Sequence, residues 1–342
     1  MAFIGLRLGN EPEMSSDRRS RVSTKSDPAD VQSLASLAEE LGYEEVWMTE
    51  GSGRDSFTQL TAIAAATNRI RLGTGILPMF SRTPLITAMS AAGLSAVSDG
   101  RFILGLGVGN RTAVEDGHGV AYRRPIEHLR DMIQIVRGLL RGEEVSYRGK
   151  AITVSRASLG GAAPQGKVPI YIAALGPRML QLAGEMADGV LLSWTAASYL
   201  EQAVQLVRDG ATKAGRDPSE VEISGYLRVA VTRDPAAGRA SLQREDARYA
   251  GGAHYRSYFE NTGFDREMEG VELARDHADD PARAAAIGEN MQRELGVVGS
   301  AEECRARLDE LRKMGLAKPV IAPLPVGDLK GSYERTIRAL AP

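Results

Sequence analysis

The chain has 342 residues, 43% of them apolar, with 42 basic and 44 acidic residues that leave a formal net charge of −2. The charges are mixed along the sequence, which argues against the basic surface of a nucleic-acid-binding protein and against binding to an anionic membrane. A single cysteine excludes an internal disulfide. The four histidines are scattered, and without an HExxH or CxxC pattern they argue against a metal site. A membrane span is not expected, because the sequence has no run of about 18 apolar residues. We therefore expect a soluble, cytoplasmic globular protein.

Short apolar runs alternate with helical patterns along the chain. The strands are expected at residues 3–8, 44–49, 71–77, 102–106, 170–173, 189–193, 221–231 and 319–324. The helices are expected at residues 28–42, 57–67, 85–98, 126–141, 198–214, 300–314 and 329–340, with a further helix that opens at Pro177. A polar stretch at 9–27 separates the first strand from the first helix. Ser300, followed three residues later by Glu303, has the spacing of a capping box.

This alternation implies a parallel sheet, and eight such units predict a (β/α)8 TIM barrel built by a single domain over residues 1–342. Two insertions are expected in it. Residues 144–147 and 151–155 form a small hairpin before the fifth strand, and the charged, alanine-rich segment 234–296 forms a helical insertion after the seventh strand.

The competing architecture is a doubly wound Rossmann sheet, whose fingerprint is GxGxxG at the opening of a helix. The segment 105–110 comes close, but Asn110 occupies the last glycine position. The residues after it, RTAVEDGHGVAYRRP, have the composition of a loop rather than of an apolar helix. The sequence therefore favours the barrel, in which functional residues lie at the carboxyl ends of the strands.

The turn after the fifth strand carries a candidate anion site. Gly176 allows close approach of a bound group to the backbone, and Pro177 suits the first position of a helix. The N–H groups of Arg178, Met179 and Leu180 would then be free at a helix N-terminus, which favours a phosphate. The alternative is an ordinary connection between a strand and a helix.

Polar residues at the other strand ends are sparse. Glu50 follows the second strand, Gly75 and Ile76 end the third, and Trp194 follows the sixth. Each has a structural alternative: Glu50 pairs with Arg54 on the surface, the glycine serves a bulge or close packing, and the tryptophan is a core or wall residue. No carboxylate pair and no Ser/His/Asp arrangement emerges, which indicates a cofactor that carries the chemistry itself.

Several segments together resemble the luciferase-like superfamily of flavin and deazaflavin barrels, and within it the coenzyme F420 branch that includes methylenetetrahydromethanopterin reductase. The matching segments are GYEEVWMTEGSGRDSFTQLTAIAAATNRIRLGTGI, SRTP, SDGRFILGLGVGN, EVSYRGKAITV and VPIYIAALGPRMLQLAGEMADGVLLSW. They cover about half the chain in the expected order, and their combination is more specific than any single glycine.

The resemblance implies that the cofactor is coenzyme F420, with FMN as the alternative. Gly75-Ile76 would be a bulge with a non-prolyl cis peptide behind the middle ring of the cofactor. The cofactor would be lined by Glu50, Gly75, Ile76, Ser81, Gly107, Asn110, Ala174, Gly176, Pro177, Arg178 and Met179, the last four around its phosphate. The family also implies a homodimer.

Two positions depart from the family pattern. Gly51 stands where many relatives have a histidine, and Asn110 stands where sugar-oxidising relatives have a catalytic glutamate. The candidates for a proton donor are Glu50, which comes first because it lies at a strand end, His118 and Glu115. The structural alternative for His118, between Gly117 and Gly119, is a loop residue without a role.

The sequence thus predicts an F420-dependent oxidoreductase that transfers a hydride between the deazaflavin and a small organic substrate. An FMNH2- and O2-dependent monooxygenase and a cofactor-binding barrel without catalysis are the alternatives.

Overall fold

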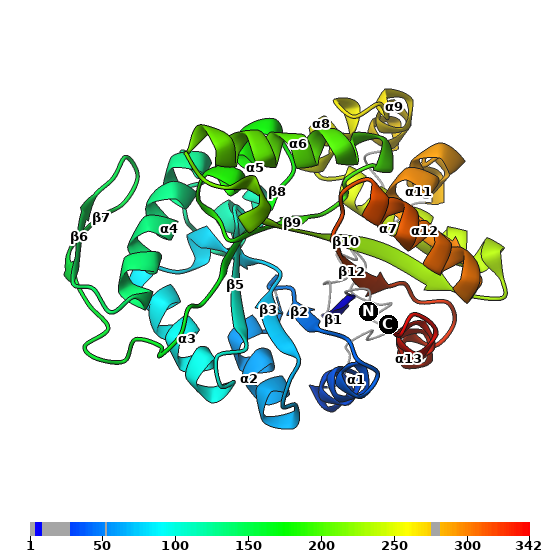
Figure 1. The fold of residues 1–342 in the computed structure, drawn as a ribbon. Coiled ribbons are helices and arrows are strands. Elements are labelled where there is room, and N and C mark those ends of the chain that lie inside the picture. The colour runs from blue at the N-terminus through cyan, green and yellow to red at the C-terminus, as the bar shows by residue number, and fades with distance from the viewer. Residues whose placement is uncertain (1–3, 9–27, 52, 275–280) are drawn as a thin grey trace.

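The computed structural model describes residues 4–8, 28–51, 53–274 and 281–342. The predicted polar stretch at 9–27 lies outside these residues. Parallel strands close a barrel in which β12 returns to pair with β1 (Figure 1). In order around the barrel the strands are β1 (Gly5–Leu8), β2 (Glu45–Met48), β3 (Arg71–Thr74), β5 (Phe102–Gly107), β8 (Ile170–Ala174), β9 (Gly189–Leu192), β10 (Glu222–Val231) and β12 (Lys318–Pro323). The predicted (β/α)8 barrel is confirmed.

Helices surround the strands and bury one continuous apolar layer between themselves and the barrel (Figure 1). They are α1 (Pro28–Glu40), α2 (Ser56–Ala66), α3 (Pro84–Val97), α4 (Pro125–Leu140), α5 (Pro177–Met186), α6 (Ala197–Lys213), α12 (Ala301–Lys313) and α13 (Leu329–Ala339), with 3-10 turns at Met79–Ser81 and Pro218–Glu220. Alternate strand residues point inward and form a second cluster that includes Trp47, Tyr171 and Tyr226. None of the described helices is both long and apolar enough to cross a bilayer.

The helix starts follow local sequence signals. Asp55 accepts a hydrogen bond from the Thr58 N–H at 2.7 Å and caps α2. Ser300 and Glu303 form the predicted capping box at α12, with bonds in both directions. Such caps can be predicted from sequence because both partners lie within one turn of helix.

Both predicted insertions are present. The hairpin consists of β6 (Val145–Arg148) and β7 (Thr153–Ala157), which pair antiparallel and project beside α4 (Figure 1). The segment after β10 contains the helices α7 (Pro235–Ala250), α8 (Ala253–Glu260), α9 (Asp265–Leu273), α10 (Pro281–Ala285) and α11 (Glu289–Leu295). Trp194, Tyr258 and Phe259 belong to a separate apolar cluster under these helices.

Three details differ from the predicted elements. The strand expected at 71–77 is interrupted by a cis peptide at Gly75-Ile76, so that β3 ends at Thr74 and β4 (Leu77–Pro78) pairs with β5. An additional strand, β11 (Gly296–Gly299), pairs with β10 and was missed because its glycines weaken the strand signal. The predicted loop after Asn110 contains a short π-helical turn, Ala113–Gly117.

Candidate active site

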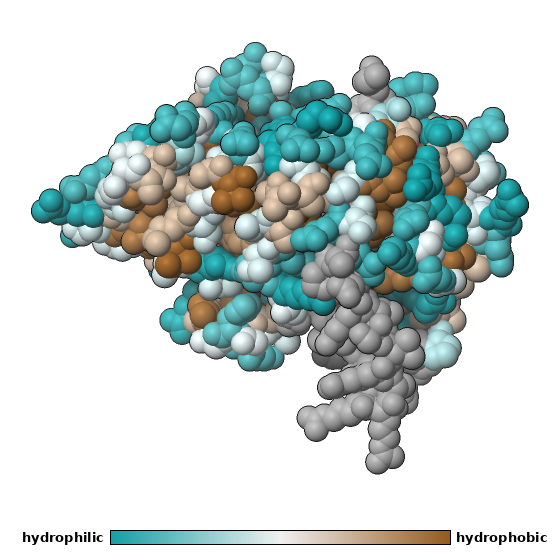
Figure 2. Space-filling view, turned by 90° about the horizontal axis from the view of Figure 1, so that it is seen from below, coloured by the Kyte–Doolittle hydropathy of each residue, from teal (hydrophilic) through white to brown (hydrophobic). Residues whose placement is uncertain are grey.

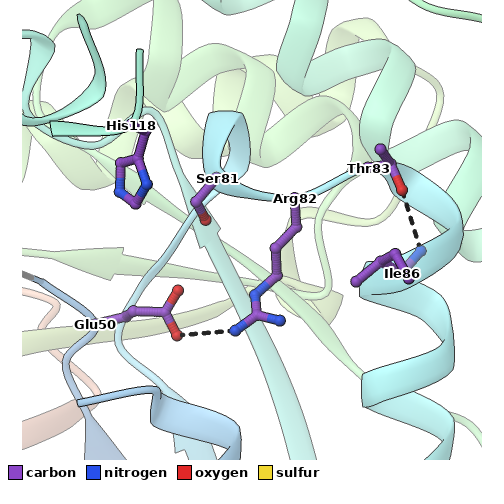
Figure 3. A pocket seen from close by; sticks show the side chains of 6 residues that line it. All are labelled: Glu50, Ser81, Arg82, Thr83, Ile86 and His118. Atoms are coloured by element: carbon purple, nitrogen blue, oxygen red, sulfur yellow. Dashed lines mark hydrogen bonds and ion pairs between the residues drawn. The ribbon is translucent and has the colours of Figure 1, made fainter. Parts of the chain in front are cut away.

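A pocket of about 460 Å³ lies at the carboxyl ends of β2 and β4. Its lining residues come from two strand ends, the start of α3 and the loop after β5, and are Glu50, Ser81, Arg82, Thr83, Ile86 and His118. Figure 3 shows Glu50 and His118 entering the pocket from opposite sides, with Ser81 between them. The fold therefore brings together both catalytic candidates and Ser81.

Glu50 is held in place by groups that donate to its carboxylate. Its Oε2 accepts from the Ser56 N–H at 3.1 Å and from the Ser56 hydroxyl at 2.7 Å. The Arg82 guanidinium lies 3.7 Å from the same oxygen (Figure 3), and the Glu50 side chain is 10% exposed. Glu50 is thus a fixed acceptor at the pocket wall. Its pairing with Arg82 shows that it is not simply a surface charge.

Arg82 links Glu50 to the start of α2. Its guanidinium also pairs with the carboxylate of Asp55, the cap of α2, and lies 5.2 Å from the centre of the Phe57 ring. Partial burial alone would raise the pKa of Asp55, but the hydrogen bonds from Thr58 and the charge of Arg82 outweigh it and lower that pKa. Sequence reasoning missed Arg82, although it lies inside the quoted SRTP motif.

His118 is exposed at the end of the π-helical turn. Its backbone N–H donates to the carbonyl of Ala113 at 3.1 Å. Its imidazole lines the pocket (Figure 3). The third candidate, Glu115, pairs with Arg111 at 3.2 Å and is not among the pocket residues. Geometry therefore favours Glu50 and His118 over Glu115 for contact with a ligand in this pocket.

The bulge after β3 is packed against the far wall of the barrel. The Tyr226 hydroxyl donates to the Gly75 carbonyl at 2.9 Å. A Cβ on Gly107 would lie 2.8 Å from Cγ1 of Ile76 and 3.3 Å from Cβ of Ala173. Gly107 therefore makes room for Ile76, and the strand ends of β5 and β8 present only small groups here. Such a surface suits the face of a flat ring.

The start of α5 matches the prediction in part. Gly176 is its N-cap and Pro177 its first residue. The N–H groups of Met179 and Leu180 are not free, however, since both donate to the Gly176 carbonyl at 3.0 Å and tighten the first turn. Only the Arg178 N–H, among the three, has no backbone acceptor in the described chain. A Cβ on Gly176 would meet nothing within 4 Å, so this turn is open to a ligand.

The remaining predicted cofactor residues differ in their hydrogen-bond partners and in their burial. The Asn110 Oδ1 accepts from the N–H of Ala113, the first residue of the π-helical turn, at 3.2 Å, so its side-chain carbonyl has a structural partner. The Ser81 hydroxyl donates to the Pro78 carbonyl at 2.7 Å, and its oxygen can still accept a hydrogen bond. Ala174 is buried at the end of β8.

Sequence reasoning missed two buried arginines at the same end of the barrel. Arg7 of β1 and Arg228 of β10 are 7% and 2% exposed. The signal was available, because a charged residue at an inward position of an apolar strand such as ISGYLRVAV has no solvent to face. Within the described residues no group of three His, Cys, Asp or Glu side chains is arranged to hold a metal ion.

Comparison with known proteins identifies relatives of this chain. The sequence profile of the family described as luciferase-like monooxygenase matches residues 14–318. A 5,10-methylenetetrahydromethanopterin reductase of Methanolobus tindarius is 34% identical, over 89% of this chain and 93% of its own length. A reductase of the same name from Archaeoglobus fulgidus is 28% identical, over 92% of this chain and 95% of its own length.

Among solved structures, the coenzyme F420 dependent tetrahydromethanopterin reductase of Methanopyrus kandleri superimposes with a TM-score of 0.83 at 25% identity, covering 99% of this chain and 97% of that one. The family profile spans most of the barrel and the relatives align along nearly their whole length. The chain therefore belongs to the luciferase-like monooxygenase family, as its motifs predicted.

Proposed function

We propose that this protein is an F420-dependent oxidoreductase that transfers a hydride between the deazaflavin and a small organic substrate. The observation that carries the proposal is the similarity, over 99% of the chain, to a reductase described as coenzyme F420 dependent. The 34% identical relative is likewise a reductase, which supports redox chemistry on an organic substrate.

The pocket geometry suggests how the cofactor is held. Gly75, Ile76 and Gly107 would support the flat ring from below, because Tyr226 leaves no room for a side chain at Gly75 and Ile76 leaves none at Gly107. Glu50 and Ser81 would line its edge, beside Asn110 and Ala174. The start of α5, from Gly176 to Met179, would hold the phosphate through the Arg178 N–H and the helix dipole.

Bound F420 supplies a carbon centre that gives or accepts a hydride. In the reducing direction the substrate would gain a hydride at carbon, supplied by the reduced cofactor, and one proton at the neighbouring atom. Glu50 and His118 face the same pocket and are the groups proposed to position the substrate and to hold that proton. The chain's own contribution is orientation and exclusion of water.

The direct test is a parallel titration of the purified protein with F420 and with FMN, followed by cofactor fluorescence. Saturable binding of F420 at micromolar concentration, with much weaker binding of FMN, is the expected result. Absence of F420 binding would refute the proposal. The variant Gly107→Val should lose F420 binding, since its side chain would occupy the space of Ile76.

A second function is an FMNH2- and O2-dependent monooxygenase, favoured by the description of the matching family. It predicts tight binding of reduced FMN and product formation that requires oxygen. Anaerobic turnover with reduced F420 would exclude it.

We further propose a homodimer formed through α2 and α3. On α3 the side chains of Ile86, Met89 and Val97 are 44%, 53% and 54% exposed. The neighbouring exposed positions of α2 and α3 are small, for example Ala65 and Gly93. Figure 2, seen from below, shows white to brown residues on the left half of the molecule, the side on which Figure 1 places these helices, and a further brown strip right of the centre. Large apolar side chains that are exposed together on one helix are typical of a protein interface.

A further inference from the structure

Arg228 is a buried cation without a counter-ion. Arg228 is 2% exposed, and among the described residues no carboxylate lies within ion-pair distance of its guanidinium. One Nη donates to the Ser193 hydroxyl at 3.1 Å, while the Nε–H has no hydrogen-bond partner. Because burying an unpaired charge is expensive, such a group in a native fold requires an explanation.

The nearby carboxylates do not form an ion pair with Arg228. Glu245 of α7 is bound by Arg248 through both of its oxygens, at 2.8–3.1 Å. Asp246, also buried, has both oxygens without a hydrogen-bond partner, and burial raises its pKa well above the usual range. Burial and then repulsion by Arg7 lower the pKa of Arg228, and they outweigh the opposing effect of Tyr249, Glu245 and Tyr255.

Trp194 holds the guanidinium in a defined plane. The Arg228 Cζ lies 3.5 Å from the centre of the indole ring, and Tyr249 packs against the same tryptophan at 4.4 Å. Trp194 is not glycine yet has φ of 57°, and its own indole N–H is buried without a partner. A stacked guanidinium keeps its N–H edge available within its plane, the geometry in which arginine grips a carboxylate.

Arg228 lies at the end of the barrel where the cofactor pocket is. Tyr226, two residues before it on β10, reaches across the barrel to the Gly75 carbonyl. Side chains two residues apart on a strand share a face, about 7 Å apart. Arg228 is thus nearer than Tyr226 to the carboxyl end of β10, at the mouth of the barrel. Its hydrogen-bond partner Ser193 directly follows β9.

We propose that Arg228, stacked on Trp194, binds a carboxylate group of the substrate at the mouth of the barrel. The Nε–H and a neighbouring Nη–H supply two parallel donors for its oxygens, and the substrate extends from there toward the bulge at Gly75. The inference rests on the proposed oxidoreductase function in naming the ligand a substrate, and it narrows the substrates to carboxylic acids.

The test uses the full chain, with benzoate as the probe and benzamide as its neutral counterpart, at constant ionic strength. The chain has two tryptophans, and Trp194 lies against the proposed site while Trp47 is bonded to Glu45 inside the barrel. Benzoate is expected to change the tryptophan fluorescence saturably, and benzamide is not. Arg228→Met should weaken the benzoate response by about tenfold or more, and Arg208→Gln, at an exposed site on α6, should leave it unchanged.

Arg228→Lys covers the case in which the methionine variant does not fold, and it should retain a weakened response. Trp194→Phe should abolish the fluorescence change. An equal response to benzamide, no response to benzoate, or an unchanged response in either Arg228 variant would overturn the proposal. F420 titrations of the same variants distinguish failure of the carboxylate site from failure of the proposed oxidoreductase function. Benzoate binding is measured without cofactor and would persist even if F420 did not bind.

Discussion

At the scale of single residues, Glu39 shows how one side chain can organise a distant connection. Its carboxylate accepts hydrogen bonds from the backbone N–H groups of Asn68, Arg69 and Ile70, at 2.6–3.0 Å. These residues form the turn that leads from α2 into β3, so the end of α1 positions the strand that carries the cofactor bulge. Burial alone would raise the pKa of Glu39, but the three N–H donors outweigh it and lower that pKa.

We expect Glu39→Gln to destabilise the protein by about 1–3 kcal/mol at pH 7, since an amide nitrogen would face backbone donors. A carboxyl with a lowered folded-state pKa stabilises the fold above its unfolded pKa of about 4.3 and loses this effect as the pH falls through the folded value. The difference in free energy of unfolding between Glu39→Gln and the unaltered chain should therefore shrink below about pH 4. Urea unfolding at both pH values measures it, with Glu40→Gln, on the exposed side of α1, as the control. A difference independent of pH would contradict the assignment.

The contact of Glu39 was not predictable from sequence, and the reason is physical. Its partners lie 29–31 residues away and are backbone groups, which leave no pattern of residue types. Caps such as Asp55 and Ser300 were readable because donor and acceptor are local. Glu50 was identified as a candidate from its place at a strand end and His118 as a possible proton donor in a loop, whereas their common pocket depends on how the loops fold together.

At the scale of elements, the hairpin is attached to the barrel through one buried carboxylate on α4. Asp131 is 2% exposed and accepts from the N–H groups of Ala151 and Ile152 and from the Tyr147 hydroxyl, at 2.7–2.9 Å. A Cβ on Gly149 would lie 2.2 Å from the Asp131 carboxylate, so this turn tolerates only glycine. The hairpin was predicted from its turn, but its attachment to α4 was not.

Asp131→Asn should loosen the hairpin without unfolding the barrel, because the loss is confined to bonds between α4 and the β6–β7 turn. Hydrogen exchange followed by mass spectrometry is expected to show faster exchange in 145–157 and unchanged protection in β5 and β8. Glu144→Gln, which removes an exposed ion pair to Arg156 on the same hairpin, serves as the control and should change little. Faster exchange throughout the barrel would show that Asp131 supports the core instead.

A second element-scale prediction concerns the end of β5. In Gly107→Ala the added methyl would lie within 2.9 Å of two carbons of Ile76, so this side chain, which is proposed to contact the cofactor, must shift. We expect F420 affinity to fall about tenfold while the melting temperature changes by a few degrees at most. Gly166→Ala, where a Cβ meets nothing within 4 Å, is the matched control for fluorescence titration. An unchanged affinity for F420 would show that Ile76 does not contribute to cofactor binding.

At the scale of the whole molecule, the barrel was the most predictable feature. Strict alternation of buried strands and helices admits few topologies, because parallel neighbours require crossovers of one hand. The cis bulge was expected only through family resemblance, since a local break at Gly75-Ile76 has no signature in composition. The buried Arg228 and its stacking on Trp194 depend on chain segments far apart in sequence, and so required the structure.

The exposed apolar surface on α2 and α3 leads to a test of assembly. In Met89→Glu a charge would be placed at the centre of this surface, and burying it in a dimer without a partner is costly. We expect light scattering to give a dimer for the unaltered chain at micromolar concentration and a folded monomer for the variant. Leu273→Glu, on α9 at 88% exposure, changes an equally apolar residue elsewhere and should remain dimeric. A monomeric unaltered chain, or a dimeric Met89 variant, would exclude this surface as the interface.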